Sequence, residues 1–419
     1  MKSLETILKI LASLILKKFK PKIIAITGTV GKTSTKEAIL TVLSHFVVRG
    51  NIKSYNNTLG VPLTILGSET GGKNIFKWLV IFIRAFLMII FPKKLSNYPG
   101  ILVLELGIDR PGDMDYFLSF IKPDIGIITA VGEAPVHVEF FKSRDALGIE
   151  KVKIVSALSN GAAIINCDDP FLDKVAKKLE FSVLTFGFEE GATVRIMEYK
   201  TTFDGTFFKI EHAGNVVPFR LPGALGIGQV YASAAATATG IFFKMNLVNI
   251  SQALLSYKPP PGRMKILPGI KESLVIDDTY NASPMAMQAA LETLNEFEAS
   301  RKIAVLGDML ELGEYTEEAH RQIGKFTAQF LDYLFVIGLR AKFISDEAKK
   351  NGLEENRIFE FNKGEEAIDK LQKIIQEEDL ILVKGSQGMR MERIVEGIMA
   401  EPNKAKDLLV RQDKAWKNK

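Results

Sequence analysis

The 419-residue sequence has only one cysteine, Cys167, and four histidines. A single thiol excludes a disulfide framework and a cysteine-rich zinc site, and it fits a protein kept in the reducing cytosol. Neither sign of charge dominates, because 54 lysines and arginines stand against 49 acidic residues and the basic residues are spread along the chain. This slight excess gives no electrostatic footprint for nucleic acid. We therefore expect a cytoplasmic protein with no nucleic-acid partner.

The sequence also lacks an apolar run long enough to cross a membrane. The most apolar stretch, residues 75–91, is interrupted by Lys77 and Arg84 and is shorter than the roughly 20 residues that a spanning helix needs. Residues 2–20 place leucines and isoleucines at helical spacing among lysines, which predicts a basic amphipathic helix. Lys9 interrupts its apolar core, which disfavours a signal peptide. For both segments, packing on their own domain and lying on a membrane surface remain open.

The composition, 47% hydrophobic and 25% charged, is that of a globular chain of two or three domains. Residues 23–35 read as a buried strand, a glycine-rich turn and the start of a helix. Gly28 and Gly31 allow backbone N–H groups to approach an anion at the helix N-terminus, Lys32 would reach phosphate oxygens, and the Thr33 hydroxyl would ligate Mg²⁺. Ile26 stands where the common P-loop has its first glycine. The turn is therefore a compressed variant of a nucleotide-binding loop.

Polar residues follow the next strands of the predicted sheet. Glu105 ends the apolar strand 101–104, a usual position for a carboxylate that holds Mg²⁺ beside a P-loop. His137 follows a third strand at 125–130, and Lys151 lies on the helix after it. Paired Asn56 and Asn57 open another helix, where they would cap it or bind a ligand.

The second half of the chain predicts a further α/β unit. Short alternating strands over 183–221 read as an antiparallel addition to the first sheet, and the proline-rich run 258–262 is the best domain boundary. Beyond it, five strands alternate with helices, which predicts a second doubly wound domain. The polar clusters 307–313 and 384–386 follow two of these strands and are expected to face one cleft.

Taken together, these motifs resemble the Mur ligase family over residues 21–400, carried by 27–33, 55–62, 105–107, 262–263, 277–284, 306–313 and 384–386. After the basic helix at 1–20 that the spacing predicts, the resemblance implies an ATP-binding central domain at 21–262 with a mostly parallel sheet, and a Rossmann-like carboxy-terminal domain at 263–419. It also implies an ATP-dependent ligase of peptidoglycan precursor synthesis that forms a peptide bond through an acyl phosphate. A peptide and a nucleotide-sugar or lipid-linked acceptor would be its substrates.

The resemblance assigns roles to individual residues. The catalytic set is Lys32, Glu105, His137 and Lys151, and the metal ligands are Thr33, Glu105, His137 and a carbamylated Lys151. The nucleotide-binding set is Gly28, Thr29, Gly31, Lys32, Thr33, Ser34, Arg263 and Asp278. The substrate set is Asn56, Asn57, Asp308, Glu311, Lys384 and Ser386. Because only a neutral amine captures CO₂, the pKa of Lys151 must be lowered, which we attribute here to neighbouring metal charge.

This chain departs from the family pattern in three places. Residues 223–229 replace the family's Gly-x-His-Asn-x-x-Asn near the adenine, and Lys151-Val152-Lys153 replaces Lys-x-Glu. About twenty residues precede the P-loop strand, where the family has a UDP-sugar domain. We hypothesise that the helix 2–20 and segment 75–91 instead lie on the inner membrane face, with Trp78, Phe82 and Phe86 in the interface.

Other protein classes compete with this interpretation. Residues 109–112 and 362–365 resemble small-GTPase boxes, but the first P-loop glycine is absent and the last box ends in Glu365. A folylpolyglutamate-type ligase shares the ATP chemistry, although 277–284 and 306–313 favour the Mur interpretation. A non-catalytic scaffold derived from a ligase is the third alternative, because of the altered adenine motif.

Overall fold

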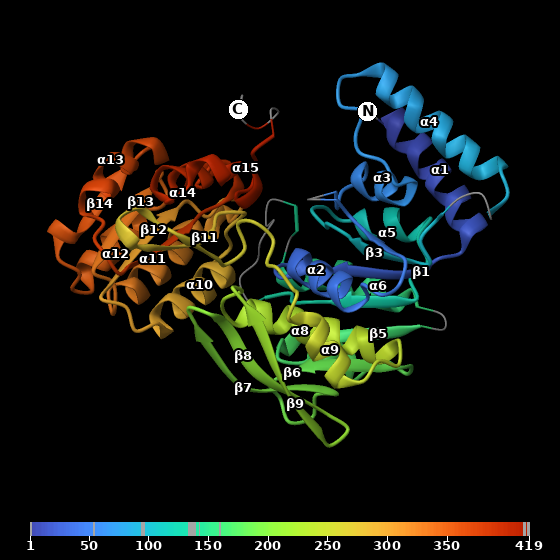
Figure 1. The fold of residues 1–419 in the computed structure, drawn as a ribbon, viewed down its shortest axis with the longest axis horizontal. Coiled ribbons are helices and arrows are strands. Elements are labelled where there is room, and N and C mark those ends of the chain that lie inside the picture. Colours follow the sequence, from blue (N-terminus) through green and yellow to red (C-terminus); the bar gives the residue numbers. More distant parts are fainter. Residues whose placement is uncertain are drawn as a thin grey trace.

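The computed structural model describes residues 2–52, 55–93, 97–132, 140–141, 143–158, 161–413 and 416. It forms two lobes, each built on its own sheet (Figure 1). The α/β class and the two successive sheets expected from the sequence are confirmed.

The first lobe contains a nine-stranded sheet in the order β2-β3-β1-β4-β5-β6-β7-β8-β9. Its parallel strands are β1 (Lys22–Thr27), β2 (Val48–Gly50), β3 (Ile101–Glu105), β4 (Ile125–Ile128), β5 (Ala162–Asn166) and β6 (Val183–Gly187). β7 (Val194–Thr202) still pairs parallel to β6, and only β8 (Gly205–His212) and β9 (Asn215–Pro222) run antiparallel to their neighbours, so the antiparallel addition expected over 183–221 begins later than predicted. Turns at 204–205 and 213–214 join them, as glycine at positive φ permits.

Helices cover both faces of this sheet. One face carries α2 (Lys32–Val42), α8 (Ile227–Phe242) and α9 (Leu247–Leu254), and their apolar residues share one core with the antiparallel strands. The other carries α1 (Lys2–Phe19), α3 (Gly60–Leu66), α4 (Ile75–Ile90), α5 (Asp113–Leu118), α6 (Arg144–Ser156) and α7 (Pro170–Ala176). Because β1 is the middle of the parallel part, its carboxyl end opens into the centre of the molecule.

The second lobe contains a six-stranded sheet in the order β10-β11-β15-β12-β13-β14. The strands are β10 (Lys265–Pro268), β11 (Leu274–Asp278), β12 (Arg301–Gly307), β13 (Tyr333–Ile337), β14 (Ile358–Phe361) and β15 (Asp379–Lys384), and only β10 is antiparallel to its neighbour. Its faces are covered by α10 (Pro284–Glu296), α11 (Thr316–Thr327) and α12 (Lys342–Lys350), and by α13 (Gly364–Ile374), α14 (Glu392–Ile398) and α15 (Ala405–Leu408). The GTPase-like residues 362–365 follow β14 in this lobe, far along the chain from the P-loop strand.

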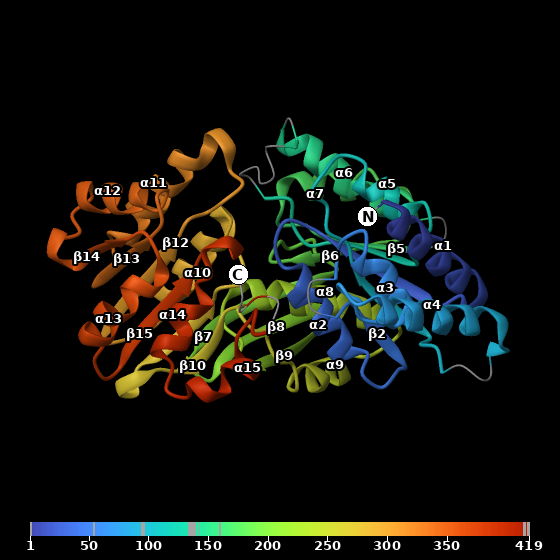
Figure 2. The ribbon, with the colours of Figure 1, turned by 90° about the horizontal axis from the view of Figure 1, so that it is seen from above.

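Helix α1 packs on its own lobe through Leu8, Ala12 and Ile15, which are fully buried. It runs beside α4 along the outer edge of the first lobe, as both ribbon views show (Figures 1 and 2). One detail of the interface hypothesis is wrong: Trp78 and Phe82 turn inward against the core, whereas Phe86 is exposed. No helix among the described residues is long and apolar enough to cross a membrane.

Candidate active site

The loop between β1 and α2 has the backbone conformation of a phosphate cradle. Gly28 and Gly31 have φ values of 148° and 82°, in the region that favours glycine. A Cβ at Gly28 would lie 2.0 Å from Thr129 Oγ1 on the neighbouring strand end, so no larger residue fits there. Gly31 precedes the first residue of α2, so the N-terminal N–H groups of α2 face the cleft.

Lys32 begins α2, and its Nζ turns back over the loop to donate to Gly28 O at 2.7 Å. Burial lowers the pKa of Lys32, while the charge of Glu105 opposes this shift. A polyphosphate bound in the loop would offer stronger acceptors to the same amine.

Thr33 and Glu105 lie together as the sequence predicts. The Thr33 hydroxyl donates to Glu105 Oε2 at 3.0 Å, and Asn56 Nδ2 donates to Oε1 at 2.9 Å. Glu105 is 2% exposed, and Asn51 holds its backbone N–H at 2.6 Å. A hydroxyl and a fixed carboxylate next to a phosphate loop are the donors that Mg²⁺ takes when phosphates and water complete its shell. These residues therefore fit the ion.

Lys151 lies on α6, buried beside the same loop. Burial, followed by the charge of Lys32, lowers the pKa of Lys151 to about 7, while Asp109 and Glu150 act in the opposite direction. The lowering thus needs no metal ion, contrary to the cause expected from the sequence. Lys153 points elsewhere and pairs with Asp115 at 2.6 Å and Glu150 at 2.8 Å. His137 lies outside the described residues.

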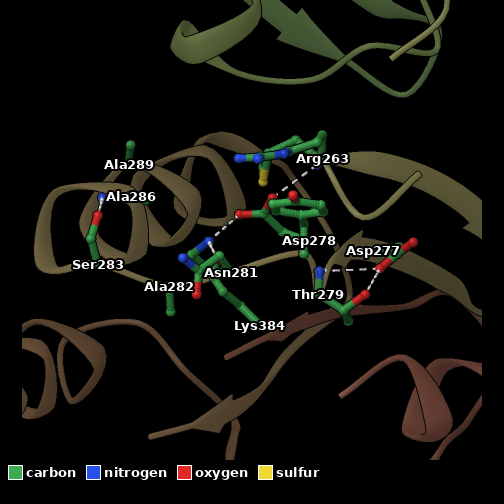
Figure 3. A network of polar contacts seen from close by, with 12 residues as sticks. Arg263, Asp277, Asp278, Thr279, Asn281, Ala282, Ser283, Ala286, Ala289 and Lys384 are labelled. Atoms are coloured by element: carbon green, nitrogen blue, oxygen red, sulfur yellow. Dashed lines mark hydrogen bonds and ion pairs between the residues drawn. The ribbon is translucent and has the colours of Figure 1, made fainter. Parts of the chain in front are cut away.

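The second lobe supplies a charged wall around Asp278, at the end of β11 (Figure 3). Lys384 Nζ approaches one carboxylate oxygen at 2.6 Å, and the N–H of Met264 donates to the other at 3.2 Å. The Arg263 guanidinium stacks 4.0 Å from the centre of the Tyr280 ring. Its Nε is buried and has no hydrogen-bond partner among the described residues, a donor available to a phosphate.

Residues that were not predicted from the sequence also support this wall. The buried carboxylate of Glu392 pairs with Arg411 at 2.9 Å, and Arg411 donates to Thr279 O and lies over the Tyr280 ring. Trp416 lines the cleft beyond it. No motif marks these residues, because isolated charges near a chain end are usually solvated.

Of the predicted substrate residues near the loop after β12, some line the cleft and one does not. Ser386 Oγ accepts from Leu310 N at 2.9 Å, and Glu311 lies in the cleft wall. Asp308 is a correction: its carboxylate accepts from the backbone N–H groups of Arg340 and Ala341 at 3.0 and 2.7 Å, and it is not among the described residues that line the cleft. Asp308 positions this loop rather than meeting a ligand.

His320, also missed from the sequence, fixes the same loop. Its Nε2 accepts from Met309 N at 3.0 Å, which leaves Nδ1–H to donate to Thr316 O at 2.6 Å, so the neutral ring is required. Burial lowers the pKa of His320 from 6.5, with Asp308 opposing this shift and Arg340 adding to it.

We expect the free energy of unfolding to fall as the pH drops below about 6.5, because the unfolded chain then binds a proton that the folded ring resists. His320→Leu should destabilise the protein by about 1–3 kcal/mol at neutral pH, since the buried Met309 N–H loses its acceptor. Urea unfolding at pH 7.5 and 5.5 measures both effects. His320→Gln keeps an acceptor without titrating and is the matched variant. An equal pH dependence in wild type and His320→Gln would contradict this role.

Groups from the phosphate loop and from the wall around Asp278 line one cleft of about 1570 Å³ between the lobes. This exceeds the roughly 300–1,000 Å³ of a pocket for one small ligand, so the cleft has room for a nucleotide and a second substrate together. The predicted residues that it brings together are Gly28, Thr29, Gly31, Lys32, Ser34, Asn56, Asn57, Glu105, Lys151, Arg263, Asp278, Glu311, Lys384 and Ser386. Thr33 joins them through Glu105.

Known proteins share both the sequence and this architecture. A family model described as "Mur ligase middle domain" matches residues 90–240, and one described as "Mur ligase, glutamate ligase domain" matches residues 262–387. The UDP-N-acetylmuramoyl-tripeptide--D-alanyl-D-alanine ligase of Buchnera aphidicola subsp. Acyrthosiphon pisum (strain APS) is 30% identical over 412 residues, which are 94% of this chain and 80% of the relative. The chain belongs to the Mur ligase family.

Other members of the Mur ligase family are similar over the same length. The ligase of the same name from Bacillus subtilis (strain 168) is 28% identical over 95% of this chain and 80% of its own length. The crystal structure of MurF ligase from Thermotoga maritima in complex with ADP superposes with a TM-score of 0.78 at 28% identity, covering 94% of this chain and 83% of that one.

Within this Mur ligase, the altered adenine motif has a structural role. Gln229 is buried, and its amide donates to Arg263 O at 3.0 Å while accepting from the Tyr257 hydroxyl at 2.7 Å. Gly226 leaves no room for a side chain, because a Cβ there would lie 2.4 Å from Thr293 Oγ1 of the second lobe. The motif thus ties α8 to the connection between the lobes and lets them approach closely.

Proposed function

We propose that this chain is an ATP-dependent peptide ligase that adds D-alanyl-D-alanine to a muramoyl-tripeptide acceptor in peptidoglycan precursor synthesis. The observation that supports this best is the arrangement of Lys32, Thr33 and Glu105 at one wall of the cleft, opposite Arg263 and Asp278 at the other. The activity for which the relatives at 28–30% identity are named indicates the substrates.

We assign the chain to three parts: a helical segment 1–20, an ATP-binding domain 21–262 and a carboxy-terminal domain 263–419. When bound, MgATP supplies the phosphoryl group that turns a carboxylate into an acyl phosphate, which an amine then attacks with release of phosphate. Thr33 and Glu105 would hold the metal, with His137 and a carbamylated Lys151 at a second ion as the resemblance implies. Lys32 and Arg263 would neutralise phosphate oxygens, and Asp278 would accept from the ribose.

The polar groups nearest the reacting carboxylate and amine come from both lobes. Asn56 lies at Glu105 and is placed to contact the acceptor. Asn57 Oδ1 caps α3 by accepting from Gly60 N at 2.8 Å, so its side chain orients that wall. Lys384 and Ser386 lie in the opposite wall, where an incoming dipeptide carboxylate would find a cation and a hydroxyl. We place the enzyme in the cytoplasm, where ATP is available.

We expect purified protein to release phosphate from ATP only when both a UDP-linked muramoyl-tripeptide and D-alanyl-D-alanine are present. Mass spectrometry of the product should show the acceptor with one added dipeptide. Omitting each substrate in turn gives the control. The proposal would be contradicted if the rate of ATP hydrolysis did not depend on either substrate. It would also be contradicted if no ligated product formed with a nucleotide-linked or a lipid-linked acceptor, a result that would favour a non-catalytic scaffold.

A further inference from the structure

Helix α4 is apolar on both its inner and its outer face. Its inner face packs on the core of the first lobe through Trp78, Ile81, Phe82, Ala85, Met88 and Ile89. Its outer face, with the following residue Phe91, consists of large apolar side chains between 44% and 76% exposed: Ile75, Phe76, Leu79, Val80, Ile83, Phe86, Leu87, Ile90 and Phe91. An apolar patch of this size on a soluble surface marks an interaction site. A helix that is apolar all round is normally covered on both faces.

The helix is too short to be covered by spanning a membrane. Sixteen residues at about 1.5 Å each reach about 24 Å, against a hydrocarbon core of about 30 Å. With its inner face already packed, α4 has only its outer face available. An occupant must therefore be a surface that meets α4 along its length.

The charges around the outer face have one sign. At 100° per residue, Lys77 and Arg84 fall on one line along the helix, between the outer and inner faces. Lys73 and Lys93 lie exposed beyond its two ends, and residues 70–104 contain no aspartate or glutamate. Long basic side chains at the margin of an apolar face reach toward anionic headgroups while their stems stay on apolar surface.

Contacts with α1 hold α4 in place. Lys18 Nζ donates to the carbonyl oxygens of Met88 and Ile89, both at 2.9 Å, and also to that of Phe91, so it caps the end of α4. Helix α1 lies beside α4 (Figure 2) and exposes a further apolar stripe of Ile7, Ile10 and Leu14, followed by Lys17. The outer face is thus presented on a fixed two-helix frame.

We propose that the outer face of α4 docks this protein on an anionic phospholipid surface, lying in the plane of the headgroups. The apolar arc enters the acyl boundary, and Lys73, Lys77, Arg84 and Lys93 meet the lipid phosphates. Charge complementarity selects lipid over a second copy of the chain, because two outer faces placed together would bring like charges into contact.

Docking would bring the cleft to the membrane. Glu5 of α1 and Glu69 and Thr70, just before α4, line the cleft. A lipid-linked acceptor could then reach the cleft from the surface on which α4 lies. This consequence rests on the proposed function, whereas vesicle binding can be measured without any ligase activity.

The test is sedimentation of the full chain with vesicles of phosphatidylcholine, with and without phosphatidylglycerol. We expect binding only to the mixed vesicles, weakened by added salt. The double variant Lys77→Gln with Arg84→Gln should bind about thirtyfold more weakly, at about 1 kcal/mol for each charge. Ile83→Glu with Phe86→Glu should abolish binding. Leu339→Glu, at an exposed apolar residue of the second lobe, is the matched control and should bind as wild type.

A second measurement tests directly how deeply the outer face of α4 enters the lipid. Phe86→Trp should be quenched by brominated acyl chains in mixed vesicles, whereas wild-type Trp78, on the inner face, should not. Absence of binding to mixed vesicles, or equal binding by wild type and Ile83→Glu with Phe86→Glu, overturns the proposal. So does a dimer in sedimentation velocity that this double variant disrupts, since a second copy would then cover the face.

Discussion

Lys32→Ala should lower the rate of ATP-dependent ligation by about 10²–10³-fold, or roughly 2.7–4 kcal/mol, while the fold persists. The expected loss is large because the Lys32 amine is preorganised in a half-buried loop, where its charge would act on the transferring phosphoryl group at a lower dielectric than that of water. Among the described residues, its hydrogen-bond partners are the loop carbonyls of Gly28 and Thr29, so removing the side chain costs the fold little. Phosphate release and ligated product measure the rate, and circular dichroism checks the fold.

Lys22→Ala is the matched control. Lys22 begins β1, the strand that leads into the loop before Lys32, but it is exposed and pairs with Asp124 at 2.8 Å. Its loss should leave ligation unchanged. Wild-type turnover in Lys32→Ala would remove Lys32 from the phosphate site, and a comparable loss in Lys22→Ala would point to damage to β1 instead.

Glu105→Gln tests the metal site in the same assay. The amide keeps the size of the side chain but not the negative charge that Mg²⁺ requires. We expect ligation to fall by at least about 10²-fold at ordinary Mg²⁺ concentrations, with part of the loss recovered as Mg²⁺ is raised. A Mg²⁺ dependence identical to that of wild type would show that Glu105 holds no metal.

The sequence predicted the parts of this site that follow from strand-end geometry. Glu105 could be placed beside Thr33 because two buried parallel strands end at the same edge of a sheet, each with a polar residue directly after its apolar run. The same rule explains why Lys384 meets Asp278 in the second sheet, although from the sequence 384–386 was grouped with the cluster 307–313 and not with Asp278. In the first case a local pattern and a topological rule were enough.

Residues whose role depends on packing could not be predicted. The residues around His320 in the sequence do not indicate that its ring accepts a hydrogen bond from Met309 N. This contact forms only when α11 is folded over the loop after β12. Asp308 looked like a ligand because it follows a strand, yet two backbone N–H groups satisfy its carboxylate. The packing of Trp78 against the core could not be predicted for a related reason. Helix α4 is apolar on both faces, so periodicity does not indicate which face is buried.

Carbamylation of Lys151 on α6 requires a neutral amine. We proposed that Lys151 carries a carbamate, in which its neutral amine attacks CO₂, forms an N–C bond and releases one proton. A cation thereby becomes an anion that is able to hold a divalent metal. An ordinary lysine, with a pKa of about 10.4, is almost wholly protonated at pH 7. Burial and the charge of Lys32 bring the pKa of Lys151 to about 7, so that about half of the amine is neutral at pH 7.

Lys151→Ala should therefore lower ligation by at least about 10²-fold, since it removes both the carboxylate and its metal. A small carboxylate such as formate or acetate should restore part of the rate by occupying the vacated space. Lys151→Arg should be inactive and unrescued, because its guanidinium fills that space and stays protonated. Lys153→Ala, two residues along on the half-exposed side of α6, is the control and should remain active.

Wild-type protein freed of CO₂ gives an independent measurement. At a fixed concentration of dissolved CO₂, the rate of reactivation should rise with pH through about 7 and then level off, because the neutral amine is the reacting form. Labelled bicarbonate should give a carbamate signal in wild type that Lys151→Arg lacks. A rate still rising toward pH 10 would mean that the amine is not buried as the structure has it. Full activity of Lys151→Ala without added carboxylate would mean that the metal site does not use this residue, and Glu105 and Thr33 would then be left as the metal ligands of the described cleft.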